Sequence, residues 1–215
     1  MATPAKTRPS VLLDEYEGVV VFLLAEGSDP EALFKQICRQ YDNTKIEQDR
    51  EGNVYLMPPC GGESSNQNFK ASLQLAAWAM RDGRGEGFDS SAAFVFPNGS
   101  KRVPDASWVS NERLLSLQYR ERRKFLKVVP EFVIEIKSPT DRYSKLQEKM
   151  HEYIENGVEL GWLIHPDLQE AKVYTQADVV THNGVQKLRG TGPVQGFELD
   201  LKPIWEGLRY GRVSS

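Results

Sequence analysis

The sequence predicts a mixed α/β fold in which helices flank a mixed central sheet, and three observations support this prediction. Residues 131–137 form a nearly continuous apolar run rich in β-branched residues, which is typical of a strand covered on both faces. A helix with apolar residues at helical spacing follows and stops at Asn156-Gly157. Residues 160–165 then form a second strand, which the right-handed crossover rule places parallel to the first.

The composition is that of an ordinary globular protein of 215 residues. The 27 Lys and Arg against 30 Asp and Glu give a net charge of −3, so any site for a polyanion must be local. Cys38 and Cys60 are the only cysteines, and we expect two free thiols in a reducing compartment. No apolar run approaches the ~20 residues of a membrane span and the N-terminal residues lack a hydrophobic signal core, so we expect a cytoplasmic protein with no membrane partner.

The chain divides into an expected N-terminal arm with a covering helix at 1–43 and a single domain at 44–210. Asp29 and Pro30 have the residue types of a helix N-cap and first helical position. Residues 45–48 and 53–57 flank a polar turn with glycine, which predicts a hairpin. Near the C-terminus, Asn183-Gly184 predicts a type I′ turn between two antiparallel strands.

A long helix is predicted to open at residues 61–64. Ser64 and Gln67 have the spacing of a capping box. The apolar stripe that we expect on this helix consists of Phe69, Leu73, Ala77 and Met80.

The strand at 131–137 carries two charges on one face. Side chains alternate across a strand, so Phe132, Ile134 and Ile136 share one face while Val133, Glu135 and Lys137 share the other. Burying a charge costs several kcal/mol unless the charge is paired or binds a metal. Two interpretations follow: a structural ion pair, or a metal-dependent hydrolase in which Glu135 and a second acid hold a divalent cation and Lys137 meets the substrate or the attacking water.

A second acid stands at the start of another predicted strand. Residues 103–109 contain Pro104, which fits only the first residue or the edge of a strand, followed by Asp105. Two further acids are candidates. Glu63 stands at the mouth of the long helix, where the helix dipole favours a carboxylate, and Glu47 lies in a strand, where a solvated side chain is the simpler interpretation.

The segment from residue 111 to residue 127 holds six basic residues and only two acids. A basic cluster is usually a solvated face. Here the cluster leads directly into the charged strand of a slightly acidic chain, which favours contacts with phosphates of a DNA backbone. The candidate contact residues are Arg113, Arg120, Arg122, Arg123, Lys124 and Lys127.

These signatures resemble those of the PD-(D/E)xK, or restriction-endonuclease-like, superfamily, in which Pro-Asp and Glu-x-Lys stand on adjacent strands. Residues 104–105 and 135–137 keep both signatures. Several longer phrases resemble the Uma-two family of this superfamily, namely residues 57–63, 104–110, 130–135, 146–150 and 161–164. The resemblance as a whole runs from about Asp29 to Trp205. The resemblance implies a restriction-endonuclease-like αβββαβ core, a nuclease-like domain with a mixed central sheet flanked by helices and extra C-terminal antiparallel strands.

The resemblance also implies a chemistry. Asp105 and Glu135 would ligate one or two Mg²⁺ ions, or Mn²⁺, with the main-chain carbonyl of Ile136 as a further ligand, and Lys137 would orient the attacking water or neutralise developing charge. Glu63 matches a supplementary acid on the first helix of the superfamily. Glu47 also falls in a family phrase, so which of the two acids serves stays open.

Three functional hypotheses follow from these residues. The first is a Mg²⁺-dependent DNA endonuclease acting as a homodimer, because two sites related by a two-fold axis suit cutting of two strands. The second is a catalytically silent DNA-binding or assembly module in which Glu135 and Lys137 pair. The third, a hydrolase of a smaller phosphoester, lacks a phosphate-cradling glycine loop.

Overall fold

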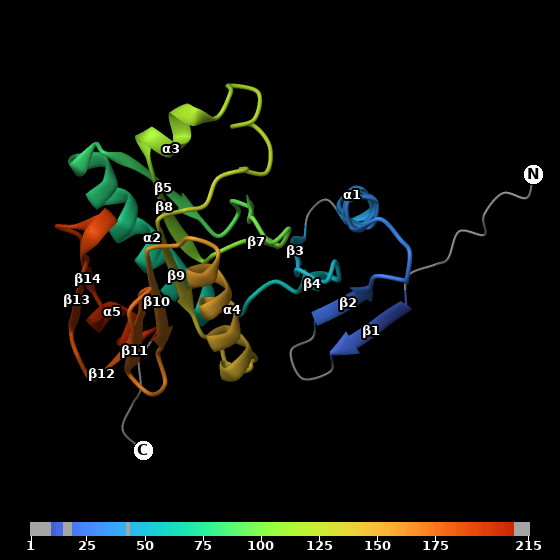
Figure 1. Ribbon diagram of the computed structural model, residues 1–215. Helices are drawn as coiled ribbons and strands as arrows, with labels where there is room; N and C mark the ends of the chain where they lie inside the picture. The colour runs from blue at the N-terminus through green and yellow to red at the C-terminus, as the bar shows by residue number, and fades with distance from the viewer. Residues whose placement is uncertain (1–9, 15–18, 42–43, 209–215) are drawn as a thin grey trace, which may run out of the picture.

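The computed structural model describes residues 10–14, 19–41 and 44–208, and it shows a mixed α+β fold (Figure 1). Within these residues the strands form two six-stranded sheets and one two-stranded sheet. The larger body is built on a sheet with the strand order β12-β11-β10-β9-β8-β5. Its strands are β5 (Gly85–Asp89), β8 (Ala106–Ser110), β9 (Phe132–Ile136), β10 (Leu160–His165), β11 (Glu170–Tyr174) and β12 (Val179–Asn183).

The centre of this sheet is a strand–helix–strand crossover. Strand β9 lies parallel to β10, and α4 (Tyr143–Glu155) connects them, as the sequence predicts. Strands β5 and β8 complete the core as antiparallel neighbours, and α3 (Asn111–Ser116) follows β8. The predicted mixed central sheet flanked by helices is therefore confirmed.

The second sheet has the order β1-β2-β4-β3-β7-β6 and lies to one side of the main body in Figure 1. The predicted hairpin at 45–57 forms its β3 and β4, which pair antiparallel. Its elements, with the helix α1 that packs on it, are β1 (Ser10–Asp14), β2 (Val19–Leu23), α1 (Pro30–Gln40), β3 (Lys45–Gln48), β4 (Val54–Met57), β6 (Phe94–Val95) and β7 (Lys101–Arg102).

Helix α1 begins as its sequence predicts, because the Asp29 side chain accepts a hydrogen bond from the Glu31 N–H and Pro30 takes the first helical position. A separate hydrophobic cluster joins α1 to the second sheet, and it includes Phe22, Phe34 and Val54. This cluster straddles the division proposed between 1–43 and 44–210, which stays a prediction.

The long helix α2 (Gly62–Asp82) forms, but its cap differs from the prediction. Gly61 is the N-cap residue and no side chain caps the helix. The capping box of Ser64 and Gln67 is not made, because the Gln67 amide instead donates to the Ile204 carbonyl at 3.1 Å. Both side chains are buried, since α5 (Lys202–Glu206) packs against this end of α2.

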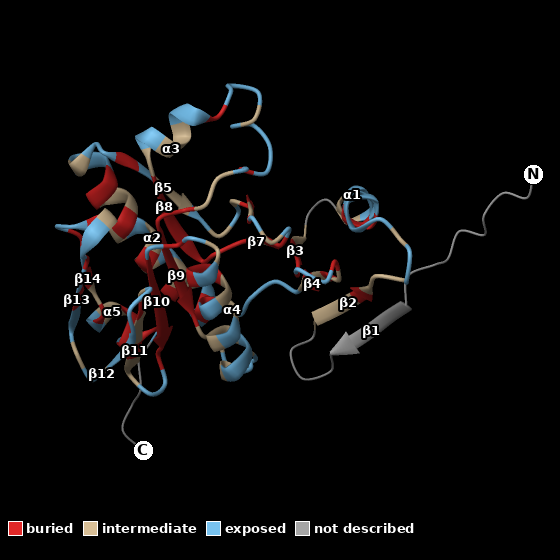
Figure 2. Cartoon of the chain, in the orientation of Figure 1, coloured by how far each residue is buried: buried red, intermediate tan, exposed pale blue. Residues whose placement is uncertain are grey.

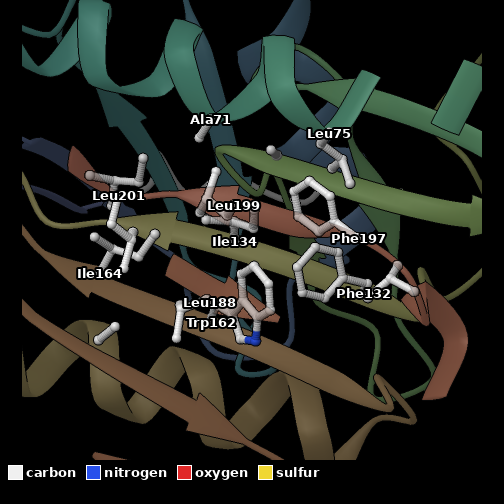
Figure 3. Packing of buried hydrophobic residues seen from close by; sticks show 14 of the residues in the cluster. Ala71, Leu75, Phe132, Ile134, Trp162, Ile164, Leu188, Phe197, Leu199 and Leu201 are labelled. Carbon is white, nitrogen blue, oxygen red and sulfur yellow. The ribbon is translucent and has the colours of Figure 1, made fainter. Parts of the chain in front are cut away.

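The apolar stripe predicted for α2 faces solvent. Phe69, Leu73 and Met80 are 63%, 54% and 83% exposed. The helix instead buries the opposite side, formed by Ala71, Leu75, Trp78 and Ala79. Figure 3 shows Ala71 and Leu75 pointing into the cluster over the sheet. The small alanines let the helix approach the strands, while Leu75 and Trp78 fill the remaining space.

The two faces of β9 belong to two different clusters, as its alternation predicts. Phe132 and Ile134 pack with Trp162 beneath α2 (Figure 3), and Ile136 belongs to the same cluster. Val133 packs on the other face with Met150 and other residues beneath α4. Figure 2 shows this central part of the sheet as buried throughout.

The C-terminal strands are antiparallel, but one predicted hairpin is wrong. Strand β12 pairs with β11, whereas β13 (Lys187–Arg189) pairs with β14 (Glu198–Asp200). The turn at Asn183-Gly184 therefore separates two sheets. Gly184 adopts a positive φ of 66°, but Asn183 does not adopt a positive φ, so the predicted type I′ turn is not formed either. The short 3₁₀ turn η1 (Gly192–Val194) connects β13 and β14.

We expect Gly85→Ala to destabilise the protein by about 1–3 kcal/mol, because a methyl group there would lie 2.3 Å from the Val109 carbonyl oxygen and 2.5 Å from the Trp108 ring. Gly62→Ala is the matched control, since nothing lies within 4 Å of a methyl group at that position. Urea unfolding of both variants measures the difference. Equal stability of the two variants would contradict the close approach of β5 to β8.

Candidate active site

Asp105 and Glu135 lie side by side on the face of the main sheet that α4 covers. The register pairs Ala106 with Ile134 and Ser107 with Val133, so the next positions outward are Asp105 and Glu135. The amide of Ile136 donates to Asp105 Oδ2 at 2.9 Å and fixes that carboxylate against β9. Both carboxylates are buried, with 8% and 3% of the residue surface exposed. Two distant segments thus bring two acids together.

Glu135 has two partners on α4. The Tyr153 hydroxyl donates to Glu135 Oε1 at 2.8 Å, and the Lys149 ammonium lies 2.8 Å from the same oxygen. Lys149 also lies 2.9 Å from Glu47 Oε1. One lysine, whose side chain is 12% exposed, therefore bridges two buried carboxylates. The ion-pair partner of Glu135 is Lys149.

Strand β3 brings two further charges to this face. Glu47 accepts from the Val103 N–H at 3.0 Å and from Arg102 at 3.2 Å, and only 2% of the residue is exposed. Lys45, on the same side of β3 by strand alternation, lies 3.4 Å from Asp105 Oδ1. The side chains of Lys45 and Asp105 are 27% and 11% exposed, so the cluster meets solvent here. The candidate site is thus formed where the two large sheets meet.

The carboxyl groups of Glu135 and Glu47 are shifted in opposite directions. Burial raises the pKa of Glu135 to about 7, with repulsion from Asp105 adding to the shift and Lys149 opposing it. Burial also raises the pKa of Glu47, but Lys149, Arg102 and Lys45 outweigh it and bring this pKa down to about 2. Burial lowers the pKa of Lys149, yet attraction to Glu135 and Glu47 outweighs it and raises the pKa overall. Glu47 is therefore the firmly ionised carboxylate.

Glu63 lies elsewhere. It is exposed on the first turn of α2, which covers the opposite face of the main sheet. Its carboxylate lies against Gly207, where an added methyl group would come within 2.1 Å of Glu63 Oε1. The sequence offers Glu63 and Glu47 as supplementary acids. Glu47 is the one that lies near Glu135, because Lys149 contacts both carboxylates.

Lys137 follows β9 on the face of Glu135 but is only partly buried. Its ammonium donates to the Ser138 carbonyl at 2.8 Å. It also lies near His165, whose pKa is lowered first by burial and then by the charge of Lys137. Lys137 therefore occupies the end of the strand that is nearer to solvent.

The basic segment divides into structural and exposed residues. Arg113 is held by Glu131 at 3.0 Å, Glu159 at 2.9 Å and the Val129 carbonyl at 2.8 Å. The remaining five, which are all exposed, are Arg120, Arg122, Arg123, Lys124 and Lys127. This segment also reaches the second sheet, because Phe125 packs edge-on against Phe34 of α1 with ring centroids 5.4 Å apart.

Sequence reasoning missed Lys149, Lys45 and Arg102. A signal for Lys149 existed, since it stands in the phrase at 146–150 that carries the family resemblance. Lys45 shares a strand face with Glu47, which alternation would show. Arg102 gives no comparable signal, because its ion pairs to Glu47 and Glu152 join distant parts of the chain.

The donor chemistry of the site fits a hard divalent cation. Asp105 and Glu135 offer carboxylate oxygens, and the Ile136 carbonyl points to the same side of β9 as its N–H, toward Asp105. The described residues contain no group of three or more His, Cys, Asp or Glu side chains gathered for a metal ion. Mg²⁺ characteristically binds through one or two carboxylates and completes its shell with waters and substrate phosphates, so two acids suffice.

The comparisons with known proteins identify the family. The model of the Uma2 family, described as "Putative restriction endonuclease", matches residues 31–202. This chain belongs to the Uma2 family. The description supports a nuclease function for this Uma2 chain and agrees with the resemblance in its sequence. No curated protein gives a significant match.

Two solved structures are similar to this Uma2 chain. One is titled a "putative nuclease belonging to DUF820" from Anabaena variabilis; it is 22% identical, with a TM-score of 0.63 over 75% of this chain and 89% of that chain, and the likeness shows the fold. The other, titled a DrdV–DNA complex, is 11% identical with a TM-score of 0.36 over 72% of this chain and 12% of that chain, which is too slight to bear on the fold.

None of the helices in the described part of the chain combines the length and apolar character needed to span a bilayer.

Burial of Glu135 predicts a dependence of stability on pH in metal-free buffer. The folded protein holds this proton up to about pH 7, whereas the unfolded chain releases it near 4.5, so the folded state binds more protons in between. The free energy of unfolding of the wild type should therefore fall as pH rises through this window, by on the order of 2–3 kcal/mol relative to Glu135→Gln.

Urea unfolding at several pH values between 4.5 and 7.5 measures this difference. Glu148→Gln, on the exposed side of α4, is the control and should follow the wild type. A constant difference between wild type and Glu135→Gln across the window would contradict the raised pKa.

Proposed function

We propose that this Uma2 protein is a Mg²⁺-dependent endonuclease that hydrolyses phosphodiester bonds of DNA, with Mn²⁺ able to replace Mg²⁺. The observation that carries the proposal is the pair of buried carboxylates, Asp105 directly before β8 and Glu135 on the adjacent β9, with Asp105 held against β9 by the Ile136 amide. A buried acidic pair costs stability, and binding a divalent cation offsets that cost.

Each residue of the site has a proposed role. Asp105, Glu135 and the Ile136 carbonyl would hold the cation, which when bound polarises a phosphoryl oxygen and lowers the pKa of water. The Ile136 amide orients Asp105. Tyr153 and Lys149 hold Glu135 in place from α4. These contacts preorganise the two carboxylates before the substrate arrives.

The two lysines have different proposed roles. Lys149 is a positioning residue, because its ammonium is buried between Glu47 and Glu135. Lys137 is partly exposed, so it can meet the scissile phosphate and neutralise charge that develops there. Glu47 is the supplementary acid, and it acts by keeping Lys149 charged and oriented.

The exposed residues of the basic segment are the proposed contacts to the DNA backbone. Arg120, Arg122, Arg123, Lys124 and Lys127 form a local cationic surface on a chain with a net charge of −3. Such residues supply affinity that is independent of base sequence. We further propose that the protein acts in the cytoplasm as a homodimer.

Asp105→Asn should reduce plasmid cleavage at least ~100-fold, because the amide keeps the shape of the carboxylate but loses its charge. Lys137→Gln should reduce cleavage by a similar factor, since it removes a positive charge aimed at the phosphate. Nicking of supercoiled plasmid in Mg²⁺ or Mn²⁺ measures both. Asp89→Asn, an exposed aspartate at the end of β5, is the control and should cut like the wild type.

Circular dichroism should show that all four proteins are folded. An Asp105→Asn variant that cuts plasmid as fast as the wild type would rule out the proposed site. A Lys137→Gln variant that cuts plasmid as fast as the wild type would exclude Lys137 from the proposed role. Salt-dependent DNA binding by the wild type with no cleavage in either metal would favour the alternative of a catalytically silent DNA-binding module.

Replacing Arg123 and Lys124 together with Gln should weaken DNA binding and reduce the slope of log affinity against log salt by about 2, because each phosphate contact contributes about 1 to that slope. Fluorescence anisotropy with a labelled duplex at several salt concentrations measures the slope. Arg113→Gln is the control, since Arg113 is engaged by Glu131 and Glu159. An unchanged slope for the double variant would exclude these two residues as phosphate contacts.

A further inference from the structure

Helix α2 carries an apolar row on the side that faces away from the molecule. Phe69, Leu73 and Met80 are 63%, 54% and 83% exposed, and they lie opposite the buried positions Leu75 and Trp78 on the helix. Figure 2 shows buried and exposed residues alternating along α2. Large apolar side chains that line one exposed helix face are unusual for a surface that meets only water.

The spacing of this row is that of a helix–helix seam. Phe69, Leu73 and Met80 follow one another at intervals of four and seven residues, and the half-buried Ala76, whose backbone lies beside Gly87 of β5, falls between Leu73 and Met80. This is the heptad pattern with which one helix packs against another, knobs into holes. A scattered set of exposed apolar residues would not keep that period.

The row is also free of charge. Residues 71–80 contain no Asp, Glu, Lys or Arg, although an exposed helix face normally carries them. Lys70 does not cover the row, because its ammonium donates to the carbonyls of Pro203 at 2.8 Å and Gly207 at 3.1 Å. An uncharged face can lie against an identical face without repulsion.

The size of the row suits a second copy of the chain. Helix α2 has 21 residues, so it is about 31 Å long. Its three large side chains expose apolar surface on the order of 400 Å², which is the size of functional patches on monomers. With the polar residues that flank the row, such a helix can approach the roughly 800 Å² per partner of a standard interface.

We propose that α2 is the interface of a homodimer, in which the rows of two copies pack antiparallel about a two-fold axis. The axis passes between Leu73 and Ala76, so that Phe69 of one copy faces Met80 of its partner and Leu73 faces Ala76. A two-fold interface uses the same patch on both copies, which requires a self-complementary row such as this one.

This arrangement has a consequence for cleavage that rests on the proposed nuclease function. Helix α2 covers one face of the main sheet, while Asp105 and Glu135 face α4 on the other. A dimer through α2 therefore holds the two sites on its outer sides, facing away from each other. Each site then meets a separate duplex, and nicked rather than linear plasmid is the expected first product.

Sedimentation velocity of the full chain, without DNA or metal, tests the interface independently of cleavage. The wild type should sediment as a dimer of the 24.3 kDa chain at micromolar concentration. Leu73→Glu should raise the Kd of the dimer at least ~100-fold, because it places two like charges near the axis. Leu115→Glu, 71% exposed on α3, is the control and should stay dimeric. A monomeric wild type, or a Leu73→Glu variant that stays dimeric, overturns the proposal.

A charge-swap experiment tests the antiparallel register. Phe69→Glu and Met80→Lys should each give monomers. The double variant should recover the dimer, because Glu at 69 then faces Lys at 80 of the partner, whereas within one helix these positions lie about 16 Å apart along the axis. Nicking assays of the same proteins report the site separately. A double variant that remains monomeric overturns this register.

Discussion

The ammonium of Lys149, buried between Glu47 and Glu135, is the interaction on which the arrangement of the site depends. It joins a strand of the second sheet to the central strand of the main sheet through a helix that packs on both carboxylates. Removing one member of such a buried pair typically costs 3–5 kcal/mol, because the remaining charge stays in a medium that solvates it poorly. The relative position of the two sheets is therefore coupled to the charge state of these three groups.

The same lysine serves two carboxylates that behave differently. Glu47 also has Arg102 and the Val103 amide, and it is firmly ionised, with a pKa of about 2. Burial raises the pKa of Glu135 to about 7, and repulsion from Asp105 adds to the shift although Lys149 opposes it. Glu47 thus serves as the structural counter-ion of Lys149. Lys149 only partly compensates the buried carboxyl of Glu135, and a divalent cation beside Asp105 would stabilise its ionised form.

Much of the framework of this site could be predicted from the sequence. Alternation predicts the faces of β9, the right-handed crossover rule predicts its parallel neighbour β10, and the family resemblance predicts that Asp105 and Glu135 stand on neighbouring strands. The inward face of α2 could not be predicted, because the helix carries apolar residues on both sides and periodicity alone does not choose between them. The family phrase at 146–150 marks Lys149 as a residue of interest, but its contact with Glu135 could not be predicted, since Lys149 lies 14 positions away on a helix and the fold brings the two together.

The apolar residues on both faces of α2 have a physical meaning. A helix with one apolar face buries it in its own domain, whereas a helix that is apolar on opposite faces needs a second surface to cover the other. In this chain the sheet covers Leu75 and Trp78, and Phe69, Leu73 and Met80 stay exposed. The main sheet thus lies between two different surfaces. The charged groups of the site lie on the face that α4 covers, and α2, on the other face, presents an uncharged row of apolar side chains. Because the sheet lies between them, association through α2 can proceed without disturbing the carboxylates.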